Sequence, residues 1–500
     1  MNQKKIGVIL SYGQIMVTIL SSLLYTPIML RILGAAEYGV YSLSSSIIGC
    51  LALLYTSMTS TYMRYYSIYK TDGNQENIAK LNGMFLIIFS ILAIIVLILG
   101  ISVSCNVDIV LGDGLNANEK ALAKILFIIM SINMAVLMIK TVFATIVISQ
   151  ERFVFIKTLG IATAVASPLI NLPLLYMGFG SIGMSWVVLF VSIVDLLINA
   201  VYLVKKLHCK FCLMNLPFKL LPEMVWFSVF IILQGIMDQF NWNLAKLLLS
   251  YVADSKAIGI YSVGLQINSL YITMSSAFCG VVVPQIYRLV RENKLLELTA
   301  LWIKVGRCQF YVMFFIWSTF LFWGKSFIRL WAGAEYDDAY YIALIFITPL
   351  VIYLCQHMGI EVLRAFNKHR QWVIVHFVFS IGGFALAVPL SKLYGGIGVA
   401  IGTAINTFLC VTFYDNWYFY KAGKLRIMDF AKDFIKFVPA CIIIAVLGIL
   451  LEQLLVTDTW FRFVSAVLIF SILYSVTMYK MAMNEYEKNQ IKTILMKFHI

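Results

Sequence analysis

The sequence predicts an all-α protein that crosses a membrane many times. Of its 500 residues, 61% are hydrophobic and only 12% are charged, whereas about a quarter of the residues in a soluble domain are charged. The apolar residues form long continuous runs, which favours helices over the alternating pattern of a membrane β-barrel. The connecting segments are too short for a folded extramembrane domain. We therefore expect the protein to act within the bilayer.

Fourteen apolar stretches are separated by polar breaks. A bilayer core of about 30 Å requires roughly 20 helical residues, and each stretch comes close to that length. The first follows a basic start as in a signal peptide, but it is too long and lacks a small-residue cleavage site, so it is expected to span. The predicted helices are 6–30, 38–63, 83–104, 121–148, 158–176, 181–204, 222–250, 258–284, 300–323, 339–360, 372–390, 397–420, 437–455 and 462–481.

The basic residues predict the orientation of these helices. Lys and Arg gather in the loops on the side of the amino terminus, and short cytoplasmic loops collect such residues. Both termini are therefore expected in the cytoplasm. The same bias accounts for most of the net charge of +14, which would face anionic membrane lipids rather than nucleic acid.

Two pairs of similar segments indicate an internal duplication. "RILGAAEYGVYSL" (31–43) is answered by "ADSKAIGIYSVGL" (253–265), where Gly259 corresponds to Gly39. "NLPLLYMGFGSIGMS" (171–185) is answered by "AVPLSKLYGGIGVA" (387–400), where Ile397 corresponds to Ile182. The two displacements are nearly equal, and each spans six helices. Two lobes of the same membrane orientation are therefore expected, an arrangement known among transporters.

The duplication predicts the domain organisation. An N-lobe of six helices covers 1–204, and a C-lobe of six helices covers 222–420. Two additional helices occupy 437–481, and a cytoplasmic tail covers 482–500.

Polar residues recur along single faces of the predicted helices. Gln14 belongs to such a stripe in the first helix, and Gln234, Asp238 and Asn241 form another in the seventh. Polar groups avoid lipid, so these faces either pack against another helix or line a wet cavity. We expect Gln14, Gln234 and Asn241 to contact a substrate in a cavity between the lobes. Asp238 and Asp195 are candidates for coupling to a proton or a sodium ion, and a structural ion pair is the alternative for Lys140, Asp195 and Asp238.

The first hinge carries a family resemblance. Arg31, Gly34, Glu37, Tyr38, Gly39 and Tyr41, after Pro27, resemble the first outer turn of the polysaccharide transporters, which are lipid-linked oligosaccharide flippases. That family belongs to the multidrug, oligosaccharidyl-lipid and polysaccharide exporter superfamily. The helix count, the two lobes and the two additional helices fit the same resemblance over the whole chain.

The resemblance implies a MATE-like fold and a function. The protein would move an undecaprenyl-pyrophosphate-linked oligosaccharide across a bacterial cytoplasmic membrane by alternating access, for surface polysaccharide synthesis. By analogy with the cationic cavities of the family, Arg31, Arg64, Lys140 and Lys246 would meet the pyrophosphate. Tyr251 stands where the duplication would repeat Arg31, so the lobes are not chemically equivalent. The implied partners are the lipid-linked glycan, membrane lipids and other polysaccharide-assembly proteins, with no bound cofactor and no resident metal.

Two other functions are alternatives on the sequence. A multidrug antiporter of the same superfamily would exchange organic cations for protons or sodium, but its cavity is expected to be acidic. A membrane enzyme of glycan synthesis would need a cluster of His and Asp that the sequence does not show. Cys209 and Cys212 form a lone C-x-x-C, which lacks the second ligand pair of a zinc site.

Overall fold

The computed structural model describes residues 3–497, and in this range every element is helical. Among the described residues, nine helices are long and apolar enough to span a membrane, and one bent pair would make a tenth. One of the nine, Ile6–Cys50, includes the predicted span 6–30 and the first half of 38–63, and another, His369–Lys421, includes both 372–390 and 397–420. The prediction of an all-α, multi-pass membrane protein is confirmed, while the total of fourteen spans stays a prediction.

The helices cluster into two compact units. Unit 1 comprises Met1–Ser262 and His376–Val399, and unit 2 comprises Val263–Val375 and Ala400–Ile500. The predicted lobe boundaries at 204 and 222 stay a prediction. The α-helices of unit 1 are α1 (Gln3–Cys50), α2 (Leu53–Thr71), α3 (Gln75–Cys105), α4 (Val107–Val110), α5 (Ala117–Ser149), α6 (Phe153–Tyr176), α7 (Gly180–Val201), α8 (Leu221–Asp238) and α9 (Leu244–Val252).

Unit 2 contains the remaining helices. They are α11 (Leu295–Trp331), α12 (Ala339–Gln356), α13 (Met358–Ala365), α15 (Asn416–Lys421), α16 (Ile427–Ile435), α17 (Val438–Leu454), α18 (Trp460–Met481) and α19 (Glu485–Lys497). Helices α10 (Ser255–Arg291) and α14 (His369–Leu409) contribute to both units. Wider π-helical turns occur at Tyr202–Lys206, Gln239–Asn243 and Cys410–Asp415, and short 3-10 turns at Phe218–Leu220 and Ala334–Tyr336.

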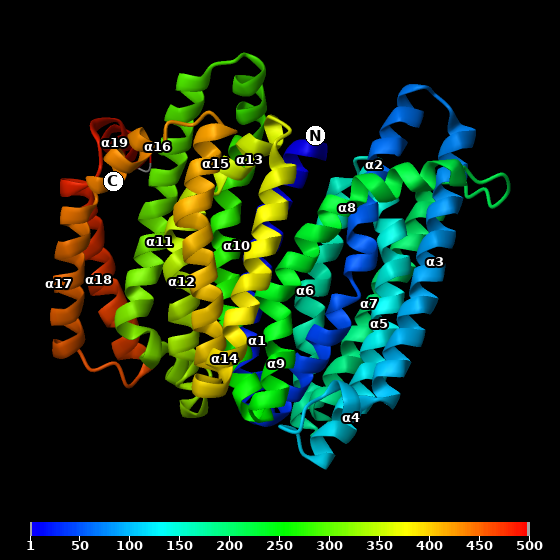
Figure 1. The fold of residues 1–500 in the computed structure, drawn as a ribbon, viewed down its shortest axis with the longest axis horizontal. Coiled ribbons are helices and arrows are strands. Elements are labelled where there is room, and N and C mark those ends of the chain that lie inside the picture. The colour runs from blue at the N-terminus through cyan, green and yellow to red at the C-terminus, as the bar shows by residue number, and fades with distance from the viewer. Residues whose placement is uncertain (1–2, 498–500) are drawn as a thin grey trace. The chain divides into compact units, whose positions relative to one another are not determined.

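The first predicted hinge is a glycine turn within α1. Gly34 has φ 72° and ψ 169°, a conformation open almost only to glycine. In Figure 1 the chain runs down from the amino terminus, reverses, and climbs toward α2. The predicted break between the first two spans is therefore present. We call residues 35–50 the second arm of α1.

The second arm ends earlier than the sequence predicts. The predicted span 38–63 is interrupted because Leu51 and Ala52 donate their backbone N–H groups to Ile48 and Gly49, both at 3.0 Å. These bonds reach back three residues instead of four, which tightens the last turn. Helix α2 then begins at Leu53.

The second pair of similar segments also contains glycine turns. Gly178, Gly180 and Gly395 all have positive φ, which explains why both segments carry glycine at the break. Glu37 connects the first hinge to this turn, because its carboxylate accepts the backbone N–H of Ser181 at 2.6 Å. Ser181 lies in the first turn of α7, where a negative charge is favourable. The charged residue in the hinge thus fixes the start of α7.

Helices α3, α5 and α7 lie side by side in unit 1 (Figure 1). Small residues permit their close approach, since a Cβ at Gly100 of α3 would collide with the Ser131 side chain of α5. Tyr62, Phe85, Phe89 and Met138 belong to one buried apolar cluster that joins α2, α3 and α5. Such burial makes this part of the unit a well-packed support for the neighbouring helices.

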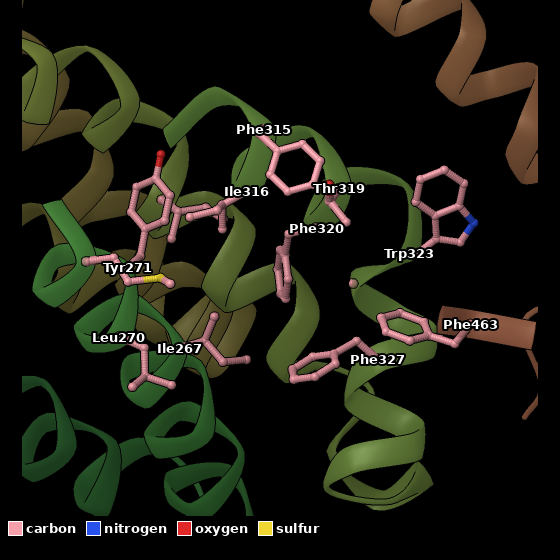
Figure 2. A pocket seen from close by; sticks show the side chains of 13 residues that line it. Ile267, Leu270, Tyr271, Phe315, Ile316, Thr319, Phe320, Trp323, Phe327 and Phe463 are labelled. Atoms are coloured by element: carbon pink, nitrogen blue, oxygen red, sulfur yellow. The ribbon is translucent and has the colours of Figure 1, made fainter. Parts of the chain in front are cut away.

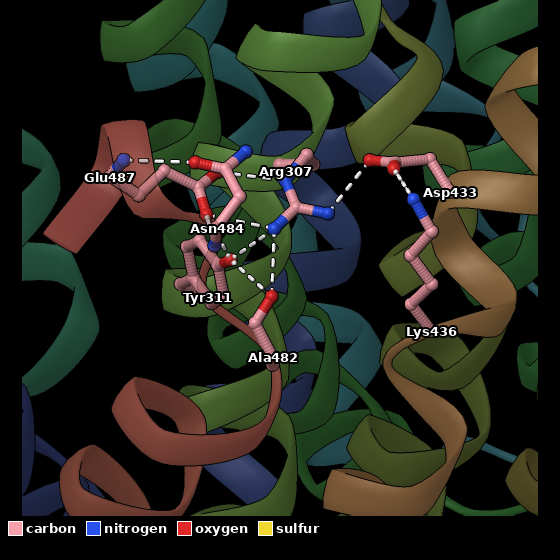
Figure 3. Close-up of polar contacts among 7 residues, drawn as sticks. All are labelled: Arg307, Tyr311, Asp433, Lys436, Ala482, Asn484 and Glu487. Atoms are coloured by element: carbon pink, nitrogen blue, oxygen red, sulfur yellow. Dashed lines mark hydrogen bonds and ion pairs between the residues drawn. The ribbon is translucent and has the colours of Figure 1, made fainter.

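In unit 2, a buried arginine attaches the carboxyl-terminal helix. Arg307 of α11 donates to both carboxylate oxygens of Glu487 on α19, at 2.7 and 2.8 Å, and to Asp433 on α16 at 2.7 Å. It also donates to the Tyr311 hydroxyl and the Ala482 carbonyl, both at 2.8 Å. Figure 3 shows the guanidinium surrounded by these acceptors. Residues from Glu485 onward therefore begin a docked helix within the predicted cytoplasmic tail.

Candidate functional site

The segment from α8 to α9 presents an open row of polar side chains. Gln234, Asp238 and Asn241 follow each other at helical spacings, and all three are half-buried. In the described part of the chain, no group forms a hydrogen bond with the side chain of any of them. Unpaired polar groups are costly in hydrocarbon. This face of the helix therefore fits a hydrated surface better than a lipid-facing one.

A second row on the same segment is fully paired. Lys246 donates to the Ser42 hydroxyl at 2.8 Å, and the Ser46 hydroxyl donates to Asn243 at 3.3 Å. The Cys50 thiol is within donating distance of the Gln239 amide oxygen at 3.4 Å and of the Ser46 carbonyl in its own helix at 3.3 Å. All three partners lie on the second arm of α1. We call these six residues the polar seam.

A π-helical turn sets the position of the seam. The turn covers Gln239–Asn243, and the Asn243 amide donates to the Gln239 amide oxygen at 2.8 Å. Turns of this kind occur often at functional sites. Sequence reasoning selected Gln234, Asp238 and Asn241 and missed Gln239 and Asn243. Gln239, Asn243 and Lys246 are spaced by four and then three residues, and this helical spacing could have placed all three on one face.

Lys246 is the candidate cation best placed beside the open row. It is half-buried, and in the described part of the chain only the Ser42 hydroxyl pairs with its ammonium group. A hydroxyl compensates a cation less well than an anion does. The ammonium group therefore retains the capacity to bind a phosphate oxygen.

Lys140 and Asp195 form an ion pair with each other. They connect α5 to α7, and Asp195 also accepts a hydrogen bond from the Asn199 amide at 2.8 Å. The side chain of Asp195 is 9% exposed and that of Lys140 is 27% exposed. These contacts favour the structural alternative for both residues over pyrophosphate binding and ion coupling.

The remaining candidates do not converge on one place. Arg31 is exposed just before the Gly34 hinge, and Arg64 is exposed on α2, about 45 Å of helical rise beyond that hinge at 1.5 Å per residue. Arg64 lies over the Tyr65 ring at 5.9 Å. Gln14 is half-buried, and its amide lies against Gly160 of α6, where an added Cβ would collide with it. These positions give each residue a separate environment.

An apolar cavity in unit 2 lacks the chemistry of a headgroup site. Its volume is about 240 Å³, and Figure 2 shows aromatic side chains from α11, among them Phe315, Phe320 and Phe327, around it. Tyr271, Thr319 and Trp323 supply its polar atoms, and no lining residue is charged. The cavity therefore suits an apolar group and offers nothing to neutralise a phosphate.

The C-x-x-C segment has a packing role. Cys209 and Cys212 are not bonded to each other. Gln150 donates to the Cys209 sulfur at 2.7 Å, and the Cys212 backbone N–H donates to the Ala79 carbonyl at 2.9 Å. The segment is thereby held against α3.

The sequence matches one protein family over more than half its length. Residues 4–290 match the family described as "Polysaccharide biosynthesis protein". A search of curated proteins by sequence finds no match.

Solved structures share the fold. The "Lipid II flippase MurJ, inward closed conformation" matches with a TM-score of 0.72 and 16% identity, covering 94% of this chain and 97% of that one. An inward-facing MATE multidrug resistance transporter of the MOP superfamily matches with a TM-score of 0.63 and 13% identity, over 85% and 99%. A MOP superfamily transporter from Pyrococcus furiosus matches with a TM-score of 0.55 and 13% identity, over 86% and 95%.

Proposed function

This chain belongs to the polysaccharide biosynthesis protein family, and from that premise we propose that it moves a lipid-linked oligosaccharide across the bacterial cytoplasmic membrane. Its fold is that of the MOP exporters, which include transporters and flippases. The proposed substrate is an undecaprenyl-pyrophosphate-linked oligosaccharide, carried from the cytoplasmic to the outer leaflet by alternating access. We further propose that both termini lie in the cytoplasm and that the transport step neither forms nor breaks a covalent bond.

The observation that carries this proposal is the open polar row beside Lys246. Gln234 and Asn241 offer amide donors and acceptors that suit sugar hydroxyls. Lys246 offers a positive charge for the pyrophosphate, in a membrane interior where such a charge interacts strongly. Because Lys140 is already paired with Asp195, we do not include it among the residues proposed to meet the pyrophosphate. The headgroup is therefore proposed to meet Lys246 first, with other polysaccharide-assembly proteins supplying and receiving the substrate.

A reconstituted flipping assay tests the proposal. Proteoliposomes would contain a fluorescent undecaprenyl-pyrophosphate glycan, and its arrival in the opposite leaflet would be measured with a membrane-impermeant quencher. Replacing Lys246→Met removes a charged hydrogen bond worth about 1.5–3 kcal/mol, so binding should weaken about tenfold or more. Lys392→Met, at an exposed lysine of α14, is the matched control. Equal flipping by empty liposomes and by the protein would refute the proposal.

Asp238 supports a second candidate function. A half-buried carboxylate with no protein partner in the described range could bind an organic cation or a coupling proton or sodium ion. A cation-coupled multidrug antiporter would use it in that way. Ethidium efflux driven by a proton or sodium gradient, without any flipping of the glycan, would favour this function.

A further inference from the structure

The second arm of α1 and the segment 239–259 run antiparallel along the polar seam. Ser42, Ser46 and Cys50 advance by one helical turn each, while their partners Lys246, Asn243 and Gln239 recede by similar steps. Each contact therefore belongs to one continuous row. The row extends from the hinge toward the middle of the predicted spans.

A crossing of two glycines closes the hinge end of this row. A Cβ at Gly39 would collide with the Ser255 carbonyl oxygen, and a Cβ at Gly259 would collide with the Ala35 carbonyl oxygen. The internal duplication relates Gly39 to Gly259 and, by the same displacement, Ala35 to Ser255. Each repeat thus offers the same surface to the other, as in a two-fold interface. The backbones meet with no side chain between them.

Further contacts seal the same end. The Tyr251 hydroxyl donates to the carbonyl of Val110 at 2.9 Å, and the Gly114 N–H donates to the Ser250 carbonyl at 3.2 Å. Ser255 donates to the Glu119 carboxylate of α5. These bonds hold the start of the second repeat against the first. In the proposed orientation this is the outer side of the membrane.

The second arm of α1 is bounded by a break in the helix at each end. Gly34, whose φ and ψ are non-helical, precedes it, and the tight turn at Leu51 and Ala52 follows it. On the opposite side, α9 ends at Val252 and Ala253 is extended. Breaks at both ends of a packed helix allow it to separate without unfolding.

We propose that the polar seam and the glycine crossing form the outer gate of the transporter, and that Lys246 is its substrate-operated latch. This inference rests on the proposed function. A pyrophosphate that reaches Lys246 draws the ammonium group away from Ser42, because the ammonium group is attracted by the full negative charge of the phosphate oxygens and only by the dipole of a neutral hydroxyl. Loss of the Ser42 contact loosens the contacts of Ser46 and Cys50 in turn. An anion is thereby required before the gate opens.

Cross-linking across the seam tests this inference. Ser46→Cys and Asn243→Cys would be joined by a short thiol cross-linker in full-length protein whose nine native cysteines are replaced by serine. Farnesyl pyrophosphate is the probe, and farnesol is its uncharged control. We expect the probe to lower the cross-linking yield several-fold and farnesol to leave it unchanged. Lys246→Met should abolish the response to the probe.

Two matched controls separate the gate from general damage. A Lys140→Cys and Asp195→Cys pair would join α5 to α7 away from the polar seam. Its cross-linking yield should therefore be the same with and without the probe. Gly39→Val should lower the seam yield without any probe, whereas Gly49→Val should not, because no atom lies within 4 Å of an added Cβ at Gly49.

The outcomes distinguish this inference from the proposed function. Binding of labelled farnesyl pyrophosphate with an unchanged seam yield would overturn the latch and leave the proposed function standing. No binding of the probe, together with a lowered yield for Gly39→Val, would contradict the pyrophosphate substrate and the latch but support the gate. Equal yields for Gly39→Val and Gly49→Val would overturn the gate.

Discussion

Removal of Lys140 should destabilise the protein through the carboxylate that it leaves behind. Asp195 is 9% exposed, and without Lys140 its remaining side-chain partner in the described range is the Asn199 amide, at 2.8 Å. Breaking a buried ion pair on one side costs about 3–5 kcal/mol. Because Lys140 is 27% exposed, we expect the lower end, about 3 kcal/mol, for Lys140→Met.

The double variant is expected to recover. Replacing a buried ion pair by apolar side chains is often neutral, since no charge is left unpaired. Asn199 keeps its hydrogen bond to the backbone carbonyl of residue 195, at 2.9 Å. Lys140→Met with Asp195→Leu should therefore regain most of the lost stability, which corresponds to a coupling energy of about 2–3 kcal/mol.

Thermal unfolding in detergent would measure the stability of the wild type, of Lys140→Met, of Asp195→Leu and of the double variant. The flipping assay would be run on the same four proteins. A stable double variant that still flips the glycan supports the structural role of the pair. Additive losses would refute the reasoning about the unpaired carboxylate. A stable but inactive double variant would indicate that Lys140 binds the substrate.

Three further predictions concern the hinge, the carboxyl-terminal helix and the coupling ion. Gly34→Ala should lower the melting temperature, because a side chain at its φ and ψ costs about 1–3 kcal/mol, whereas Gly13→Ala, in open space within a helix, should not. Arg307→Met should expose α19 to protease at neutral pH. Burial raises the pKa of Glu487, but hydrogen bonds from Arg307, the Asn484 backbone and Tyr311 hold it below the ordinary 4.5. A lowered carboxyl pKa contributes stability that is lost as the pH falls through the pKa of the folded state. In the wild type, α19 should therefore detach only below about pH 4.5. Asp238→Asn should make transport independent of the proton or sodium gradient, and unchanged dependence in that variant would leave Asp238 without a coupling role.

The sequence predicts the breaks in the fold better than the contacts across it. Gly180 and Gly395 were recognisable because positive φ demands glycine and the two repeats carry it at corresponding places, and Gly34 was recognisable as a glycine in the break between two apolar runs. The role of Glu37 was not recognisable from the sequence, because its partner, the Ser181 N–H, lies far along the chain. The tight turn at Leu51 was missed because the apolar run contains no helix-breaking residue at that point.

The candidate site was predicted by residue type rather than by pairing. Intramembrane charge drew attention to Lys140, Asp195, Asp238 and Lys246, but only the structure shows that the first two bind each other. The π-helical turn shifts the register, so Gln239 and Asn243 face α1 instead of continuing the predicted row. Helical periodicity of 3.6 residues does not foresee such a shift.

Water access to the open polar row is the most direct test of a hydrated substrate surface in this protein. Asn241→Cys, in protein whose native cysteines are replaced, would be treated with a charged, membrane-impermeant maleimide in sealed vesicles, with Leu169→Cys, an exposed apolar position of α6, as the comparison. We expect rapid labelling at 241, protection there by farnesyl pyrophosphate, and slow labelling at 169. Labelling at 241 only by a lipid-soluble reagent would contradict a hydrated substrate surface.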